Sequence, residues 1–214
     1  MRDILFEHID YLSDRVRIEQ FTAAIEKLIK PEHVVLDLGC GTGILGLIAL
    51  RTGARKVYFV DGGAVIEAAR HTITEAGFAD RAEFFRTNSF ELELPERVDV
   101  AICDHVGCFG FDYGILPALA DAKERLVKPE GIVLPAELEL KLAPVDSERN
   151  YKNIEEWKDG NVPRDFEWLW SFAANTKWLG LHSASDLLSK PASLVTLQLG
   201  RKPDAYMSWS TSFT

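Results

Sequence analysis

The sequence lacks the features that mark several large classes of protein. No apolar run reaches the roughly 18 residues that a transmembrane helix needs, so no membrane association is expected. Acidic residues interrupt the first positions of the chain, which argues against the apolar core of a signal peptide. These absences predict a cytoplasmic protein.

Cysteine and basic residues are also scarce. The chain has 3 cysteines, without a CxxC or CxxH pair and without an HExxH helix, which argues against a disulfide framework and against a bound metal. Its 33 acidic residues outnumber its 24 basic ones and give a formal net charge of −9. Because nucleic-acid-binding domains usually carry a basic face, no nucleic-acid partner is expected.

What the chain does contain is an alternation of short apolar runs with helical patterns between residues 34 and 134. This alternation predicts an α/β fold with a parallel, doubly wound, Rossmann-like sheet that is covered by helices on both faces. Residues 1–33 have helical periodicity and add helices before the first strand. The predicted strands are residues 34–38, 56–60, 82–86, 98–103 and 132–134, the last preceded by a turn at 128–131.

The pattern changes after Pro135. Residues 137–142, 193–199 and 206–210 alternate with period two, which is typical of half-exposed antiparallel strands. The segment between them is helical or irregular and contains four of the five tryptophans. The sequence therefore predicts two domains, 1–135 and 136–214.

A glycine-rich loop joins the first predicted strand to the next helix, as Asp37-Leu38-Gly39-Cys40-Gly41-Thr42-Gly43. Glycines allow a tight turn and a close approach of the backbone to a ligand. Asp61 ends the next strand, where a carboxylate is suited to accept the hydroxyls of a ribose. These features together predict a nucleotide-type cofactor.

Two cofactors fit this loop. The segment Gly41 to Gly46 matches GxGxxG, the dinucleotide pattern of NAD-dependent oxidoreductases. S-adenosylmethionine has an amino-acid tail and a sulfonium in place of a pyrophosphate. The carboxylate of Asp37 would attract the ammonium of this amino-acid tail, whereas it would repel a pyrophosphate. The charge argument therefore favours S-adenosylmethionine.

The loop and its surroundings closely resemble the protein arginine methyltransferase family. The matching segments are Asp14 to Arg17, Val35 to Leu45, Gly53 to Val57, Glu93 to Asp99 and Leu126 to Pro135. The resemblance covers roughly residues 8 to 145. It implies a class I methyltransferase domain followed by a β-barrel-like domain with a helical arm. This barrel is either short or cut off at Thr214.

The resemblance also implies roles for single residues. Arg17 would bind the cofactor carboxylate, and Asp61 would hold the ribose where the family has Glu. Asn88 and Ser89 stand at the positions where the family contacts the adenine of the cofactor. The family's adenine-binding acid falls near Phe90. The predicted cofactor-binding set is Arg17, Asp37, Gly39, Gly41, Gly43, Asp61, Gly62, Asn88 and Ser89.

The acceptor loop departs from the family. Asp104 matches the first of two glutamates that hold a guanidinium, but Tyr113 stands at the second, and the family's Thr-His-Trp motif is absent. Asp104 and His105 are the catalytic candidates, since either is suited to take a proton from the acceptor, although His105 is equally consistent with a packing role. Asp112 and Tyr113 are predicted to line the acceptor site.

These departures look like those of bacterial relatives of the arginine enzymes with an altered acceptor site. The predicted function is methyl transfer from S-adenosylmethionine to a nitrogen or oxygen of a small molecule. A protein arginine acceptor is the alternative. An NAD-dependent oxidoreductase and a non-catalytic cofactor-binding subunit are alternatives of other classes. The resemblance further implies a homodimer that forms through residues 150–178. Packing of Trp168, Trp170 and Phe172 within the same barrel is equally consistent with the sequence.

Overall fold

The structure is a computed structural model that describes residues 2–107, 109–111, 113–158, 160–177, 180, 182–204 and 206–213, with side chains from residue 8 onward. The chain divides into two compact units. Met1–Leu138 with Leu197–Met207 form the first, and Glu139–Thr196 with Ser208–Thr214 form the second. None of the helices in these described ranges is long and apolar enough to cross a bilayer.

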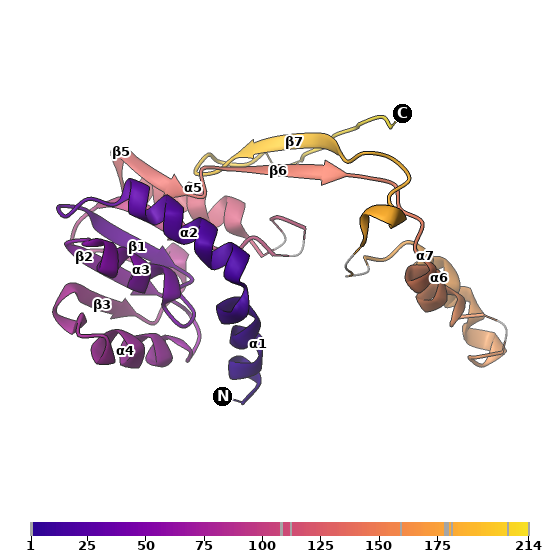
Figure 1. Ribbon diagram of the computed structural model, residues 1–214, viewed down its shortest axis with the longest axis horizontal. Coiled ribbons are helices and arrows are strands. Elements are labelled where there is room, and N and C mark those ends of the chain that lie inside the picture. Colours follow the sequence, from indigo (N-terminus) through magenta and orange to yellow (C-terminus); the bar gives the residue numbers. More distant parts are fainter. Residues whose placement is uncertain are drawn as a thin grey trace. The chain divides into compact units, whose positions relative to one another are not determined.

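The first unit is built on a five-stranded sheet in the order β3-β2-β1-β4-β5, and every neighbouring pair is parallel (Figure 1). This arrangement confirms the predicted doubly wound α/β fold. The chain order reverses between β1 and β4, where ligands bind in folds of this kind. The strands are β1 (Val34–Leu38), β2 (Lys56–Val60), β3 (Ala82–Phe85), β4 (Val98–Cys103) and β5 (Val127–Leu134).

Helices cover the sheet and divide the core into two layers. Successive side chains of β1 point to opposite faces, so Val35 packs in one buried cluster with Ile25 of α2, whereas Leu36 packs in the other with Leu119 of α5. All five β1 residues are buried, as expected for a central parallel strand. The helices are α1 (Arg2–Ser13), α2 (Arg15–Leu28), α3 (Ile44–Thr52), α4 (Ile66–Glu75) and α5 (Ile115–Arg125), with the 3₁₀ turns η1 (Ala79–Arg81) and η2 (Ser89–Glu91).

The turn predicted at residues 128–131 is incorporated into β5 as a bulge. Val98 pairs with Val127 and Val100 pairs with Ile132, so the intervening segment of β5 loops out opposite a single residue. The Lys123 ammonium closes this bulge by donating to the carbonyls of Lys128 at 3.1 Å and Gly131 at 2.6 Å. The strand is therefore longer than the sequence pattern predicts, because a side chain from α5 satisfies the looped-out carbonyls.

Outside the parallel sheet and its helices, the chain forms a small two-stranded sheet and several short helices. β6 (Glu137–Leu142) and β7 (Ala192–Gln198) run antiparallel, which confirms the small antiparallel sheet (Figure 1). The strand predicted at 206–210 is wrong, because this segment pairs with no strand in the described chain. Met207 instead packs against the apolar cluster of the first unit. Met207 and Trp209 are partly buried and the residues on either side of them are exposed, which accounts for the alternating pattern. The helical elements are α6 (Glu148–Glu155), η3 (Arg164–Leu169), α7 (Trp170–Ala174) and η4 (Ala184–Asp186).

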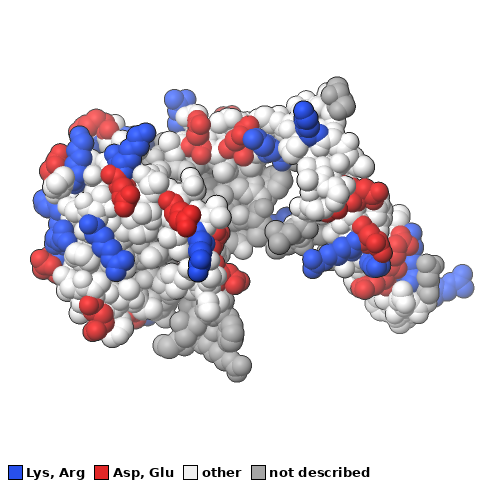
Figure 2. Space-filling view, in the orientation of Figure 1, with Lys and Arg blue, Asp and Glu red and all other residues white. Residues whose placement is uncertain are grey.

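Charged side chains of both signs are scattered over the visible surface of the protein. Figure 2 shows basic and acidic residues interspersed on this face. Several charged residues of the chain form ion pairs, including Arg55 with Glu96 at 2.8 Å and Lys56 with Glu83 at 2.7 Å. Basic residues on the surface are thus partly neutralised by neighbouring acids.

Candidate active site

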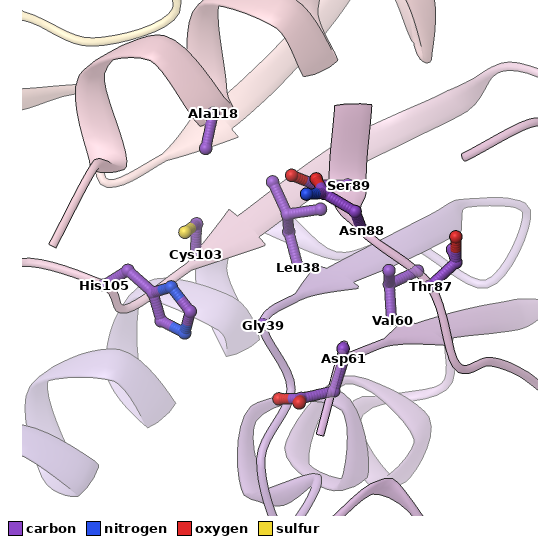
Figure 3. Close-up of a pocket in the computed structure, with 11 residues that line it drawn as sticks. Leu38, Gly39, Val60, Asp61, Thr87, Asn88, Ser89, Cys103, His105 and Ala118 are labelled. Atoms are coloured by element: carbon purple, nitrogen blue, oxygen red, sulfur yellow. The ribbon is translucent and has the colours of Figure 1, made fainter. Parts of the chain in front are cut away.

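A cavity of about 420 Å³ opens in the first unit at the carboxyl ends of β1, β2 and β4 (Figure 3). Six predicted residues line it, namely Gly39, Asp61, Gly62, Asn88, Ser89 and His105. The other lining residues, which are not among the predicted site residues, are Leu38, Val60, Thr87, Cys103 and Ala118. Leu38, Val60 and Cys103 end buried strands, a position that would have identified them once the sheet order was known.

The glycine loop is held against β2 by its own backbone. The N–H groups of Gly39 and Cys40 both donate to the carbonyl of Val60, at 2.8 and 2.9 Å. Gly39 and Gly41 have φ of +71° and +52°, a region that favours glycine. A Cβ at Gly39 would overlap the imidazole of His105, so this glycine makes room for the ring at the cavity wall.

Asp61 fixes the other side of the same loop. Its Oδ2 accepts from the N–H of Gly41 at 3.0 Å, and its Oδ1 accepts from the N–H of Gly63 at 2.7 Å. A carboxylate has about four acceptor positions, so two remain for hydroxyl donors in the cavity. The donor set therefore fits a ribose, and the predicted role of Asp61 stays a prediction.

Asp37 lies beneath the loop and is 2% exposed. Its Oδ2 accepts from the N–H of Gly46 in the first turn of α3, at 2.8 Å. Burial raises the pKa of this carboxyl to about 7, although the bond from Gly46 opposes the rise. Asp37 thus holds the first turn of α3, which follows the loop, and it is not among the residues that line the cavity.

Arg17 and Asp104 form an ion pair that the local sequence pattern does not predict. Arg17 Nη1 lies 2.5 Å from Asp104 Oδ2, and both side chains are about one-fifth exposed. Arg17 Nη2 also donates to the carbonyl of Tyr11 at 2.7 Å. Burial raises the pKa of Asp104, whereas the Arg17 guanidinium lowers it. The cofactor-binding and catalytic candidates are therefore in direct contact.

Two histidines lie on the glycine loop. The imidazole of His105 is directed toward Gly39 in Figure 3, and a Cβ at Gly41 would lie 2.9 Å from Nε2 of His8. His105 lines the cavity and directly follows Asp104. Its position is compatible both with proton transfer and with packing, so its catalytic role stays a prediction.

The far wall of the cavity is formed by Thr87, Asn88 and Ser89, where η2 begins. Asn88 caps this turn, because its Oδ1 accepts from the N–H of Phe90 at 3.0 Å. Arg125 of α5 donates to the carbonyl of Ser89 at 3.0 Å and thereby anchors the turn. This wall is polar, and Arg125 of α5 fixes its backbone on the side away from the cavity.

The remaining acceptor candidates are Tyr113 and Asp112. Tyr113 is 55% exposed on the loop that precedes α5. Asp112, which was also predicted to line the acceptor site, lies outside the described residues. Among the side chains that are described, no group of three or more His, Cys, Asp and Glu is arranged to hold a metal ion.

The second unit has a separate apolar cavity of about 550 Å³, lined by Trp157, Leu169, Ser171, Phe172, Ala173, Asn175 and Thr176. Two aromatic side chains beside it remain strongly exposed, Trp168 at 61% and Phe172 at 64%. Their rings contact each other edge to face, with centroids 5.4 Å apart. Trp178, which ends the predicted dimerisation segment, lies outside the described residues.

Comparison with known proteins identifies methyltransferases. A family model described as ribosomal protein L11 methyltransferase (PrmA) matches residues 21–168, more than half of the chain. Protein arginine N-methyltransferase 2 of Dictyostelium discoideum is 32% identical over 155 residues, which are 71% of this chain and 30% of that protein. Protein arginine N-methyltransferase 6 of Xenopus laevis is 28% identical over 201 residues, 90% of this chain and 59% of that protein. The chain thus spans between about a third and three-fifths of the length of these relatives.

A solved structure agrees with these relatives. The Trypanosoma brucei PRMT1 enzyme–prozyme heterotetrameric complex with AdoHcy contains a chain that is 26% identical to this one, with a TM-score of 0.83. The match covers 92% of this chain and 63% of that one. The likeness therefore extends beyond the parallel sheet to most of the chain.

Proposed function

The chain belongs to the protein arginine methyltransferase-like family of class I S-adenosylmethionine-dependent methyltransferases, and from this premise we propose that it transfers a methyl group from S-adenosylmethionine to a nitrogen acceptor. The observation that carries the proposal is the cavity at the carboxyl ends of β1, β2 and β4, with its glycine cradle and Asp61. This membership argues against the NAD-dependent alternative that the GxGxxG pattern left open.

The residues of the cavity fit this cofactor. Asp61 retains acceptor positions for the ribose hydroxyls, and Asn88 and Ser89 supply polar groups for the base. Gly39 of the lining and Gly41 beside it provide the close backbone approach. Arg17 lies outside the lining and donates to Asp104 and to the Tyr11 carbonyl, and its guanidinium has five N–H donors, so others remain for a carboxylate. S-adenosylmethionine, when bound, supplies a methyl group on a positively charged sulfur.

Asp104 and His105 are proposed to orient the acceptor and to hold its proton. A carboxylate held near the methyl-transfer position favours a cationic acceptor and stabilises the charge that develops there. The Arg17 guanidinium fixes the Asp104 side chain, so that alignment of the acceptor is built into the fold. His105 is the adjacent group at the cavity wall that is able to accept a proton.

The acceptor that these observations favour is an arginine side chain of a protein. The similar relatives are protein arginine N-methyltransferases, which supports this acceptor over the small molecule that the sequence departures predicted. Tyr113 supports the small-molecule alternative, because a phenol cannot replace a carboxylate in a paired clamp on a guanidinium. The bacterial type and the cytoplasmic location remain predictions from the sequence.

Residues 150–178 are proposed to join two copies of the chain. Trp168 and Phe172 expose most of their rings, and aromatic residues are enriched among the anchors of protein interfaces. The Trypanosoma brucei relative is a heterotetramer, so assembly between related chains has a precedent in a similar structure.

Methyl-labelled cofactor tests the proposed reaction. The purified chain is incubated with labelled S-adenosylmethionine, an arginine-rich peptide and a lysate from its own source. Label recovered as methylarginine supports the proposal, whereas label confined to small molecules supports the alternative acceptor. Asp104→Asn should abolish either signal, and Glu148→Gln, which changes an exposed acid of α6, should leave it unchanged.

A chain that binds S-adenosylhomocysteine but transfers no label would overturn the enzymatic proposal. It would favour the non-catalytic cofactor-binding subunit, and adding a catalytic partner chain would then test that function. A chain that binds no S-adenosylhomocysteine would contradict the cofactor assignment as well.

A further inference from the structure

The cavity wall formed by Thr87, Asn88 and Ser89 carries an amide and two hydroxyls but no carboxylate. Figure 3 shows Asn88 and Ser89 on one side and the Asp61 carboxylate on another. We infer that this wall reads the cofactor base through the amide donor of Asn88 and through hydroxyls, without a carboxylate that selects the exocyclic amine of adenine. The inference rests on the proposed function, because it requires that the cofactor base occupies this wall.

The orientation of the Asn88 amide is set by the backbone. A backbone N–H only donates, so the atom that accepts from Phe90 N at 3.0 Å must be Oδ1 and not Nδ2. The oxygen is therefore committed to capping η2. The two N–H donors of Nδ2 remain for a group in the cavity, since Asn88 is one of its lining residues.

The turn that holds Asn88 is braced from α5. Arg125 donates to the carbonyls of Ser89 at 3.0 Å and of Leu92 at 2.8 Å. Asp121 orients the same guanidinium through bonds of 2.7 and 2.6 Å. Reversing the Asn88 amide would bring an N–H against the Phe90 N–H within a turn that is already anchored. The donor is thus a fixed property of the site.

No carboxylate on this wall competes with that donor. Among the described residues that line the cavity, Asp61 is the sole acid, and its two oxygens accept from Gly41 and Gly63. Thr87 and Ser89 add hydroxyls, which rotate to donate or to accept. Phe90, the next residue of η2, is apolar and half exposed.

This donor set tolerates a change at the 6-position of a purine. Adenine presents an amino donor there, and hypoxanthine presents a carbonyl acceptor, whereas both keep acceptor nitrogens elsewhere in the ring. A site with a carboxylate for the amine would reject hypoxanthine strongly, because an unpaired or repelled buried group is costly. A site with an amide donor and two hydroxyls has a partner for either base.

Calorimetric titration with S-adenosylhomocysteine and S-inosylhomocysteine tests the inference without turnover. We expect the two dissociation constants of the wild-type chain to lie within about threefold of each other. Asn88→Asp keeps an equally good cap for η2 but adds a carboxylate. This variant should prefer the adenine ligand by about tenfold or more, which is the effect expected of one selective hydrogen bond.

The control is Asn161→Asp, which introduces the same charge on an exposed loop of the second unit and should change neither affinity. Circular dichroism of Asn88→Asp establishes that the variant is folded. A wild-type preference for the adenine ligand above tenfold would overturn the inference while leaving the proposed cofactor in place. Failure of both ligands to bind would overturn both.

Discussion

Arg17 Nη1 and Asp104 Oδ2 lie 2.5 Å apart although 87 positions separate them in the chain. The guanidinium also lies over the Tyr11 ring, 4.8 Å from its centroid, and donates to the Tyr11 carbonyl. One side chain of α2 thus connects the end of α1 with the segment that follows β4. The predicted cofactor-binding arginine and the predicted acceptor-binding acid form one electrostatic unit.

This pairing predicts a shift in the pH dependence of methyl transfer. Burial already raises the pKa of Asp104, and Arg17 restrains that rise. Arg17→Gln should therefore raise the pKa of Asp104 further, because the guanidinium that lowers it is removed. If the ionised Asp104 carries the reaction, the acidic limb of kcat, measured with saturating cofactor, moves to higher pH. Arg15→Gln, an exposed neighbour at the start of α2, should leave the limb in place. An unmoved limb in Arg17→Gln would exclude Asp104 as the titrating group.

Asp37 predicts a pH-dependent change in folding stability. The folded pKa of about 7 lies above the ordinary 3.8, so the folded state holds the proton more tightly than the unfolded chain. Stability from this group is fully present below pH 4, decreases as the pH rises and is lost above pH 7. The rise is equivalent to about 4 kcal/mol. Asp37→Asn stays neutral and keeps an acceptor for the Gly46 N–H.

Urea unfolding of the wild type and Asp37→Asn, followed by circular dichroism, measures this effect. The variant should gain free energy of unfolding relative to the wild type between pH 5 and pH 8, by at most about 4 kcal/mol. A constant difference across this range would contradict the raised pKa. We also expect Asp37→Asn to weaken S-adenosylhomocysteine binding above pH 7, where the wild-type carboxyl is ionised and favours the ammonium.

Gly39 predicts a local steric effect on the site. Gly39→Ala would place a methyl group within the His105 ring and force a non-glycine residue to a φ of +71°. Gly77→Ala has a similar φ of +81° but meets no atom within 4 Å, so it isolates the backbone strain. Both variants should lose about 1–2 kcal/mol of stability from that strain. Only Gly39→Ala should also lose affinity for S-adenosylhomocysteine, by about tenfold or more. Equal affinities in the two variants would remove the role assigned to the Gly39–His105 contact.

Asp61 predicts a graded loss of cofactor affinity. Asp61→Ala removes both acceptors for the N–H groups of Gly41 and Gly63, whereas Asp61→Asn keeps one of them. Calorimetry should therefore show weaker S-adenosylhomocysteine binding in the order wild type, Asn variant, Ala variant, with about tenfold lost per hydrogen bond. Asp80→Asn, an exposed acid of η1, is the matched control. Wild-type affinity in Asp61→Ala would refute the ribose assignment.

The exposed aromatics of the second unit predict an effect on assembly. Trp168→Ala combined with Phe172→Ala removes two rings that are 61% and 64% exposed. We expect sedimentation to show a dimer for the wild type and a monomer for this variant, because truncation of central aromatic anchors costs about 2 kcal/mol or more each. Tyr206→Ala removes an aromatic that is 84% exposed in another segment and should not change the oligomeric state. A wild-type monomer would contradict the proposed interface.

The sequence by itself determined the order of the elements along the chain and the glycine loop at the carboxyl end of β1. Three strand predictions coincide with β1, β2 and β4, because buried parallel strands leave short β-branched runs that local pattern alone reveals. The glycine loop and Asp61 were equally visible, since tight turns and strand ends restrict residue type locally. Six of the predicted residues therefore line the cavity.

Only the tertiary structure decided which distant groups meet. The insertion of β4 beside β1 brings Asp104 to Arg17, and no local periodicity encodes that neighbour relation. The same is true of Arg125 behind Asn88, and of Lys123 in the bulge of β5. The 206–210 prediction failed for a related reason, because alternation records which side chains are buried and not whether a partner strand is present. Burial, ion pairing and the resulting pKa shifts depend on the surroundings that the fold assembles, and they were therefore decided in three dimensions.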